Sequence, residues 1–183
     1  SLEARLAAVV WDVGALPLPL PNDLAHVESY LDALQPHAFI LSGGGDIGTP
    51  ASRARVEDAV LARARGRRLP VLGICRGMQV MLAHCGGRLI RLSGHVGERH
   101  RVRGPGFSFD SVNSYHEWGI IDEGLPDGFR VEARADDGTI EAVTHVSLPW
   151  TGIMWHPERE GATDEAQLEL VRRALLADAP RAA

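Results

Sequence analysis

Apolar residues follow two alternating patterns along the first half of the chain. Continuous apolar runs at 38–41 and 70–74 are typical of strands buried on both faces. Apolar positions at helical spacing predict helices over the ranges 2–13, 23–34, 53–65, 76–84 and 164–177. Such alternation of strand and helix predicts an α/β fold, with a mostly parallel central sheet between helices on both faces.

The pattern changes after Gly87 to shorter runs separated by turns. The further strands predicted here are 101–112, 129–134, 139–146 and 150–155. The segment Ala135-Asp136-Asp137-Gly138 is typical of a hairpin turn, so several of these strands are expected to be antiparallel. No repeat or linker interrupts the chain, and residues 1–183 are expected to form a single domain.

Composition narrows the classes of function. The 183 residues include 45% hydrophobic and 23% charged positions, as in a globular domain with a sizeable core. A net charge of -5 argues against a nucleic-acid partner, and no apolar run approaches the ~18 residues of a membrane span. Two cysteines are too few for a disulfide framework, which favours a reducing, cytoplasmic compartment.

Cys75 lies where a buried strand is predicted to turn directly into a helix. It is the centre of the segment Gly73-Ile74-Cys75-Arg76-Gly77. A nucleophile on such a sharp turn crowds its neighbours, and glycines two residues away on each side remove the Cβ atoms that would clash. The helix N-terminus also favours a thiolate. Most free cysteines are small core residues, and Cys85, which lacks this context, is interpreted in that way.

His156 and Glu158 follow the last predicted strand, in the segment Trp155-His156-Pro157-Glu158. A cysteine nucleophile requires an imidazole to accept its proton, and the imidazole requires a carboxylate to fix its tautomer. Alone, this short motif could equally be a loop with a surface acid. Together with Cys75 it predicts a catalytic triad of Cys75, His156 and Glu158.

Three segments, in this order along the chain, resemble the signatures of class I glutamine amidotransferases and γ-glutamyl hydrolases. They are Leu41–Gly45, Gly73–Gln79 and Trp155–Glu158. The resemblance implies a three-layer, flavodoxin-like fold with a small additional antiparallel sheet, and a reaction that needs no metal or organic cofactor. It also implies a strand before the first helix. Since the chain starts at Ser1, next to that helix, we expect this strand to be missing.

The resemblance also implies roles for individual residues. Backbone N–H groups of Gly44 and Arg76 would form the oxyanion hole, for which closely approaching amides are suited. The residues implied to bind the glutamyl part of the substrate are Gly45, Gln79, Ser114, Tyr115 and His116. For His116 the alternative is a loop histidine that is satisfied by local contacts.

The implied reaction is hydrolysis of a γ-glutamyl amide, or of glutamine, through a γ-glutamyl thioester. The segments 112–120 and 153–160 look like those of stand-alone γ-glutamyl hydrolases, in particular γ-glutamyl-CDP-amidate hydrolase. One alternative is a glutaminase subunit that supplies ammonia to a separate synthetase partner. Another is a degenerate domain that binds a ligand without catalysis, against which the intact triad argues.

A cluster of basic residues is the one feature of the sequence that indicates which amine leaves in the reaction. It consists of His95, Arg99, His100 and Arg101, with Arg103 nearby. Arginines suit phosphate recognition, so these side chains are candidate phosphate contacts. The alternative is a strand edge blunted by charge. His95 and His100 lack a third residue at convincing metal-ligand spacing, and no metal site is predicted.

Overall fold

The computed structural model describes residues 4–45, 47–48, 50–160 and 164–176. Its helices are α1 (Ala4–Asp12), α2 (Val27–Leu34), α3 (Ala51–Arg67), α4 (Arg76–His84) and α5 (Glu165–Leu176), with short 3-10 helices η1 (Asp122–Gly124) and η2 (Pro157–Arg159). Its strands are β1 (Phe39–Leu41), β2 (Val71–Ile74), β3 (Ile90–Arg91), β4 (Val96–Arg103), β5 (Phe109–Tyr115), β6 (Trp118–Gly119), β7 (Phe129–Ala135), β8 (Ile140–His145) and β9 (Trp150–Ile153).

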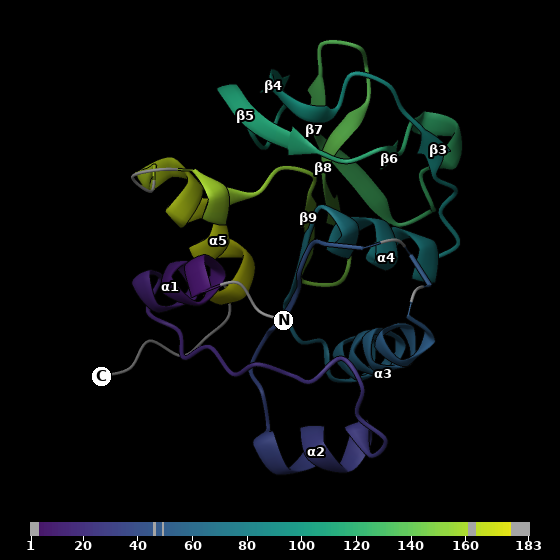
Figure 1. Cartoon of the computed structure of the whole chain (residues 1–183), viewed down its shortest axis with the longest axis vertical. Helices are drawn as coiled ribbons and strands as arrows, with labels where there is room; N and C mark the ends of the chain where they lie inside the picture. The colour runs from purple at the N-terminus through teal and green to yellow at the C-terminus, as the bar shows by residue number, and fades with distance from the viewer. Residues whose placement is uncertain (1–3, 46, 49, 161–163, 177–183) are drawn as a thin grey trace.

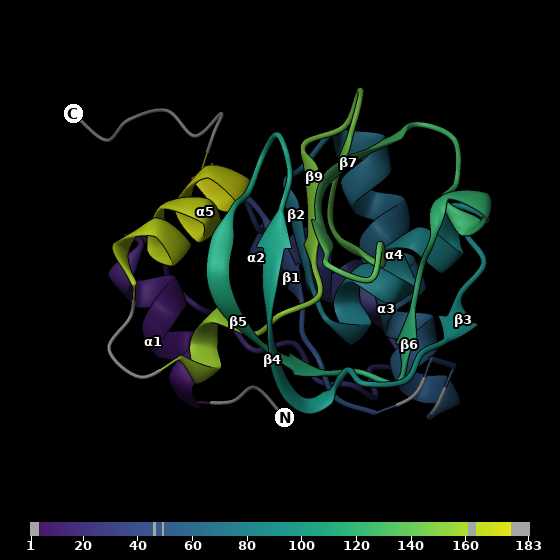
Figure 2. The same ribbon diagram turned by 90° about the horizontal axis from the view of Figure 1, so that it is seen from above.

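The main sheet is mixed and runs in the order β1-β2-β9-β8-β7-β4-β5. Only β1, β2 and β9 pair in parallel, and every other pairing in this sheet is antiparallel. Strands β3 and β6 form a separate two-stranded antiparallel sheet. In Figure 1 the main sheet separates α1 and α5 from α3 and α4, and Figure 2 shows the same three layers from above.

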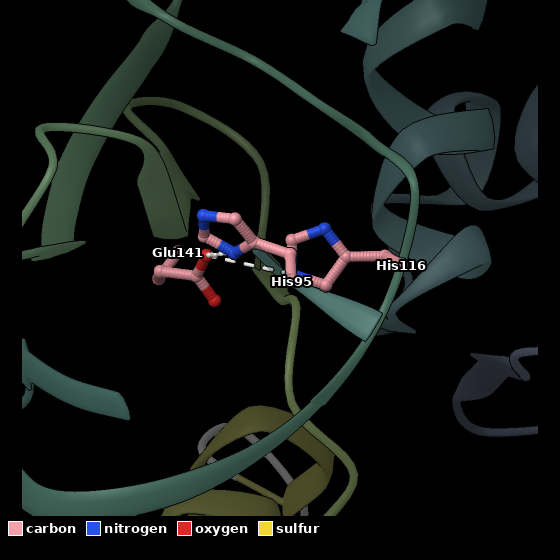
Figure 3. A group of neighbouring side chains, drawn as sticks. All are labelled: His95, His116 and Glu141. Carbon is pink, nitrogen blue, oxygen red and sulfur yellow. Dashed lines mark ion pairs between the residues drawn. The ribbon is translucent and has the colours of Figure 1, made fainter. Parts of the chain in front are cut away.

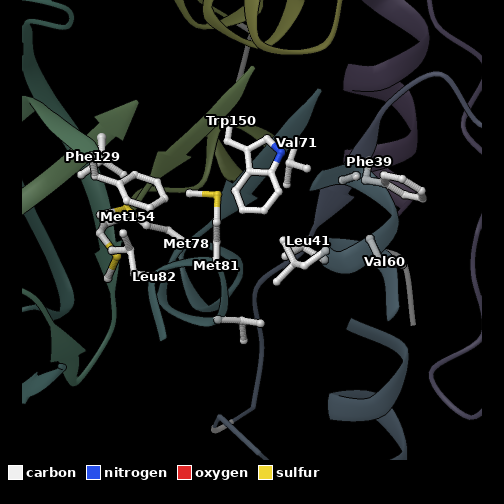
Figure 4. Close-up of a cluster of buried hydrophobic side chains, with 14 of the residues drawn as sticks. Phe39, Leu41, Val60, Val71, Met78, Met81, Leu82, Phe129, Trp150 and Met154 are labelled. Carbon is white, nitrogen blue, oxygen red and sulfur yellow. The ribbon is translucent and has the colours of Figure 1, made fainter. Parts of the chain in front are cut away.

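Each face of the sheet has its own hydrophobic core. On one side Trp150, Met78 and Met81 pack with residues of α2, α3 and β1 (Figure 4). On the other side Leu72 and Trp155 pack against α1 and α5. Each of these buried side chains stabilises the fold by about 1.5–3 kcal/mol, so both helical layers are fixed against the sheet.

The three-layer α/β prediction is confirmed, but the sheet is less parallel than predicted. The pairs β4–β5 and β7–β8 are each joined by a short turn, whereas a parallel pairing needs a longer crossover connection. The predicted strand 101–112 is two strands, β4 and β5, which pair through a turn between them. The hairpin turn at Ala135–Gly138 is confirmed: the Gly138 N–H donates to the Ala135 carbonyl at 3.0 Å, and Gly138 has φ +90°.

Two predicted helix boundaries were wrong. Helix α2 begins at Val27 rather than at Asp23, because residues 22–26 form a bend and a turn. Helix α3 continues through Gly66 to Arg67, and Arg68 ends it in the left-handed conformation at φ 54°. Within the described residues, no helix is long and apolar enough to cross a membrane.

Candidate active site

Cys75 occupies a strained turn between β2 and α4. Its backbone has φ 52° and ψ -110°, a conformation that residues with a side chain rarely adopt. A Cβ built on Gly73 would lie 2.7 Å from the Met78 nitrogen, and one on Gly77 would lie 1.8 Å from the Leu41 oxygen. The predicted steric reason for both glycines is therefore confirmed.

The environment of the Cys75 thiol favours its neutral form. Burial raises the pKa of Cys75 to about 11, although a hydrogen bond from the Arg76 backbone N–H and the charge of Arg159 lower it. The helix N-terminus was expected to favour the thiolate, but burial of the thiol has the larger effect on its pKa and favours the neutral form. A group that accepts the thiol proton is required for nucleophilic attack near neutral pH.

His156 and Glu158 lie at the same edge of the sheet as Cys75. The Cys75 N–H donates to the Ile153 carbonyl at 2.7 Å, which fixes the turn against the end of β9. His156 follows β9 and is buried, and its Nδ1 lies 2.7 Å from Glu158 Oε1. With Nδ1–H donating to this carboxylate, Nε2 is the basic nitrogen of a neutral ring.

Asn113 fixes the backbone of His156 and was not singled out from the sequence. Its Oδ1 accepts from the His156 N–H at 3.0 Å, and its Nδ2 donates to the His156 carbonyl at 2.8 Å. The same Nδ2 donates to Glu160 Oε1 at 2.6 Å. Asn113 is one of several polar residues of β5, so its type gave no distinguishing signal, and its partner lies 43 residues away.

The glycine-rich segment after β1 passes close to His156. A Cβ on Gly43 would lie 2.6 Å from His156 Cε1, so only glycine fits there. Arg53 of α3 holds this segment by its carbonyls, donating to Gly44 at 2.7 Å and to Ser42 at 2.9 Å.

Glu57 connects the glycine segment to the Cys75 turn. It accepts from Arg53 Nε at 2.8 Å and also pairs with the buried guanidinium of Arg76. The two residues predicted to supply the oxyanion hole, Gly44 and Arg76, are thus tied to the same carboxylate. Neither Arg53 nor Glu57 was predicted, because their partners are distant in the sequence.

The predicted substrate-binding residues differ in accessibility. Tyr115 is exposed, and its ring lies 6.0 Å from that of His156. Gln79 is buried and donates to the Trp118 carbonyl at 2.7 Å, and the Ser114 hydroxyl donates to the His95 carbonyl at 2.7 Å. A pocket lined by Ala4, Arg5, Tyr115 and Arg159 opens beside the ring of Tyr115. Gly45 is exposed in the glycine segment, with φ +74°.

The predicted basic cluster is neutralised by carboxylates. Arg99 contacts Glu160 at 3.1 Å, and Arg101 contacts Asp136 at 3.0 Å. His95 is buried, and His100 Nε2 lies 3.4 Å from Glu141 Oε2. The rings of His95 and His116 both face Glu141, and these three are the described residues grouped closely enough to hold a metal ion.

Comparisons with known proteins found a matching family model and several similar proteins. A family model for class-I glutamine amidotransferases matches residues 4–171. The chain is 31% identical to γ-glutamyl-CDP-amidate hydrolase of Campylobacter jejuni, with 84% of this chain and 75% of that protein covered. It is 28% identical to γ-glutamyl-γ-aminobutyrate hydrolase of Escherichia coli, with 86% and 78% covered.

Other similar proteins are named as parts of synthases. The chain is 31% identical to the small chain of carbamoyl phosphate synthase of Thermus thermophilus, with 96% of this chain covered. It spans only 42% of that relative's length. The crystal structure of a GMP synthase subunit from Thermoplasma acidophilum has a TM-score of 0.74 at 23% identity, covering 92% of this chain and 84% of that one, which establishes likeness of fold.

Proposed function

The chain belongs to the class I glutamine amidotransferase family, and we propose that it hydrolyses a γ-glutamyl amide bond with Cys75 as nucleophile. The observation that carries this proposal is the strained turn of Cys75 beside the strand that leads to the buried His156–Glu158 pair. Residues 1–183 would act as one amidotransferase-type domain.

The first half of the reaction forms a thioester. His156 Nε2 takes the proton from the Cys75 thiol, and the sulfur attacks the γ-carbonyl carbon. The backbone N–H groups of Gly44 and Arg76 stabilise the oxyanion that develops. The carbonyl re-forms as the C–N bond breaks, and the His156 imidazolium donates its proton to the leaving nitrogen.

The second half releases glutamate. His156 removes a proton from water, the oxygen attacks the thioester carbon, and the C–S bond breaks. The imidazolium then returns its proton to the Cys75 sulfur. Glu158 keeps its charge throughout and stabilises the imidazolium in both halves, as its 2.7 Å contact with Nδ1 allows.

The glutamyl moiety is proposed to bind near Gly45, Gln79 and the segment Ser114–His116. Because the Ser114 hydroxyl and the Gln79 amide already donate to backbone carbonyls, we expect Ser114 to act through its backbone and Gln79 through its amide oxygen. Tyr115 offers an exposed ring that lies 6.0 Å from the ring of His156.

A γ-glutamyl phosphoramidate nucleotide is the proposed substrate class, supported by the similarity to the Campylobacter jejuni hydrolase. Of the four predicted phosphate contacts, the half-exposed Arg99 and Arg101 are retained in the proposal. His95 and His100 are not, because both rings face the buried Glu141.

A glutaminase that supplies ammonia to a separate synthetase is the second candidate. It is favoured by the similarity to the small chain of carbamoyl phosphate synthase. This candidate shares the thioester chemistry and differs in the leaving group, which is ammonia.

The test is release of glutamate from a panel of L-glutamine, γ-glutamyl-aminobutyrate and a γ-glutamyl nucleotide amidate. We expect turnover of the nucleotide amidate by the isolated chain, and a loss of at least about 10,000-fold in the Cys75→Ser variant. Activity that survives in this variant contradicts the proposal. Turnover of glutamine alone, and only after a synthetase is added, supports the second candidate instead.

A further inference from the structure

Three segments that are distant in the sequence bring His95, His116 and Glu141 together inside the protein. His95 immediately precedes β4, His116 immediately follows β5, and Glu141 lies in β8. All three are at least 97% buried. Figure 3 shows both imidazoles beside the Glu141 carboxylate.

The atoms that face one another in this cluster make ion pairs at 3.4 or 3.5 Å, but within the described residues they form no hydrogen bond of ordinary geometry. These atoms are His95 Nδ1, His116 Nε2 and both carboxylate oxygens of Glu141. Each of the two nitrogens lies 3.5 Å from Glu141 Oε1. A buried polar atom without a partner costs about 1–3 kcal/mol, so several at one point indicate that a further group belongs between them.

The opposite side of each imidazole is occupied. His95 Nε2 lies 2.9 Å from Asp137 Oδ2, and His116 Nδ1 lies 3.1 Å from the Trp118 carbonyl oxygen. Because a carbonyl and a carboxylate only accept, the ring protons lie on these outer nitrogens. In a neutral ring the inner nitrogen then carries the lone pair, the arrangement by which proteins orient histidine ligands toward a metal ion.

We propose that His95 Nδ1, His116 Nε2 and Glu141 hold a divalent transition-metal ion of the Zn²⁺ type. The three ligand atoms lie within 4.8 Å of one another. Two ligands of a tetrahedral zinc ion at its usual bond lengths are about 3.3 Å apart, so modest side-chain movement of about 1 Å closes the site. His100 Nε2 lies 3.4 Å from the other carboxylate oxygen, Glu141 Oε2, and pairs with it beside the three ligands.

The ion has a positioning role behind the candidate glutamyl site. The Trp118 carbonyl that receives the His116 ring proton also receives the Gln79 amide at 2.7 Å. An ion on His116 therefore fixes the ends of β4 and β5 to β8 and holds the carbonyl that orients Gln79. This inference does not rest on the proposed hydrolase activity, because its test measures bound metal.

The test is titration of the chelator-treated full chain with Zn²⁺ alone. Metal content is measured after gel filtration, and the melting temperature is measured at each step. We expect about one tightly bound equivalent and a higher melting temperature in the loaded protein. Co²⁺ at the site gives d–d absorption without a thiolate charge-transfer band, and the Cys75→Ser variant gives the same spectrum.

Three variants locate the ion. His116→Gln removes a ligand and weakens Zn²⁺ binding by at least about 100-fold, whereas Asp137→Asn removes only an orienting partner and weakens it by about 10–100-fold. Asp137 is half-exposed, so this second variant folds even if the first does not. His84→Gln changes a histidine that contacts Asp58 at the surface, and it leaves binding unchanged.

The proposal is overturned if the wild-type chain takes up no Zn²⁺. It is also overturned if His84→Gln loses as much Zn²⁺ binding as His116→Gln, or if the Co²⁺ spectrum contains a thiolate charge-transfer band. In those cases the cluster consists of imidazolium–carboxylate ion pairs around Glu141.

Discussion

The Cys75 thiol holds its proton more tightly in the folded protein than in the unfolded chain. Burial raises its pKa from the usual 9.0 to about 11. Its contribution to stability is therefore present below pH 9.0 and is lost as the pH rises toward about 11, because only the unfolded thiol ionises in that window. Between pH 9.0 and about 11, we expect the free energy of unfolding of the wild type to fall by about 2–3 kcal/mol more than that of Cys75→Ser.

Urea titrations at several pH values check this prediction. Cys85→Ser, which alters the other free cysteine, serves as the matched control and keeps the part of the pH dependence that Cys75 supplies. Parallel curves for the wild type and Cys75→Ser would show that the thiol is not desolvated.

Asn113 is a positioning residue whose effect is expected on kcat. Asn113→Ala leaves the His156 N–H and carbonyl without their buried partners and frees the base to move. A displacement of about 1 Å in a catalytic group can lower kcat by about 100-fold, and we expect a loss of about 10–100-fold with little change in KM. Steady-state kinetics measure it, and the exposed Asn22→Ala is the control. An unchanged kcat refutes the role.

At the scale of elements, β1 and α4 approach so closely that no side chain fits between them at Gly77. A Cβ on Gly77 would lie 1.8 Å from the Leu41 carbonyl oxygen, so Gly77→Ala must push β1 away from α4. We expect a loss of about 3 kcal/mol or more in the free energy of unfolding. Denaturant unfolding measures it.

Gly66→Ala is the matched control for this prediction. Gly66 lies within α3, and a Cβ there would meet nothing within 4 Å. Alanine is the better helix former, so this variant gains about 0.5–1 kcal/mol. If both variants lost stability equally, the close approach of β1 and α4 would not be the cause.

The Arg53–Glu57 pair joins α3 to the two segments that supply the proposed oxyanion hole. Arg53→Met removes the guanidinium that holds the carbonyls of Ser42 and Gly44, and we expect kcat to fall by about 10–100-fold. Arg55→Met changes a mostly exposed arginine of the same helix, 4.0 Å from Asp23, and retains full activity. Equal kcat values of the two variants would contradict the role of Arg53 in holding the carbonyls of Ser42 and Gly44.

For the whole molecule, the sequence predicted those features that depend on interactions between residues close together in the chain. The glycines around Cys75 and the pair His156–Glu158 are local patterns with local steric and electrostatic causes. The order of elements predicted the layers, and the turn at 135–138 predicted the antiparallel pairing of β7 with β8. The pairing of β4 with β7, which closes the sheet between distant segments, was not predicted.

What sequence reasoning missed depends on contacts between distant segments. Glu141 is the one acidic residue of β8, and its partners His95 and His116 are 46 and 25 positions earlier. Asn113 and Arg53 likewise act on segments 43 and 11 positions away. No periodicity or short motif connects such residues, and only the assembled fold brings them together.

Covalent trapping tests the assignment of Cys75 as nucleophile most directly. A diazoketone analogue of glutamine alkylates the sulfur that attacks the γ-carbon, and intact-protein and peptide mass spectrometry locate the adduct. We predict one adduct per chain, on Cys75, present in the Cys85→Ser variant and absent from Cys75→Ser. An adduct on Cys85, or labelling that persists in Cys75→Ser, would contradict the account.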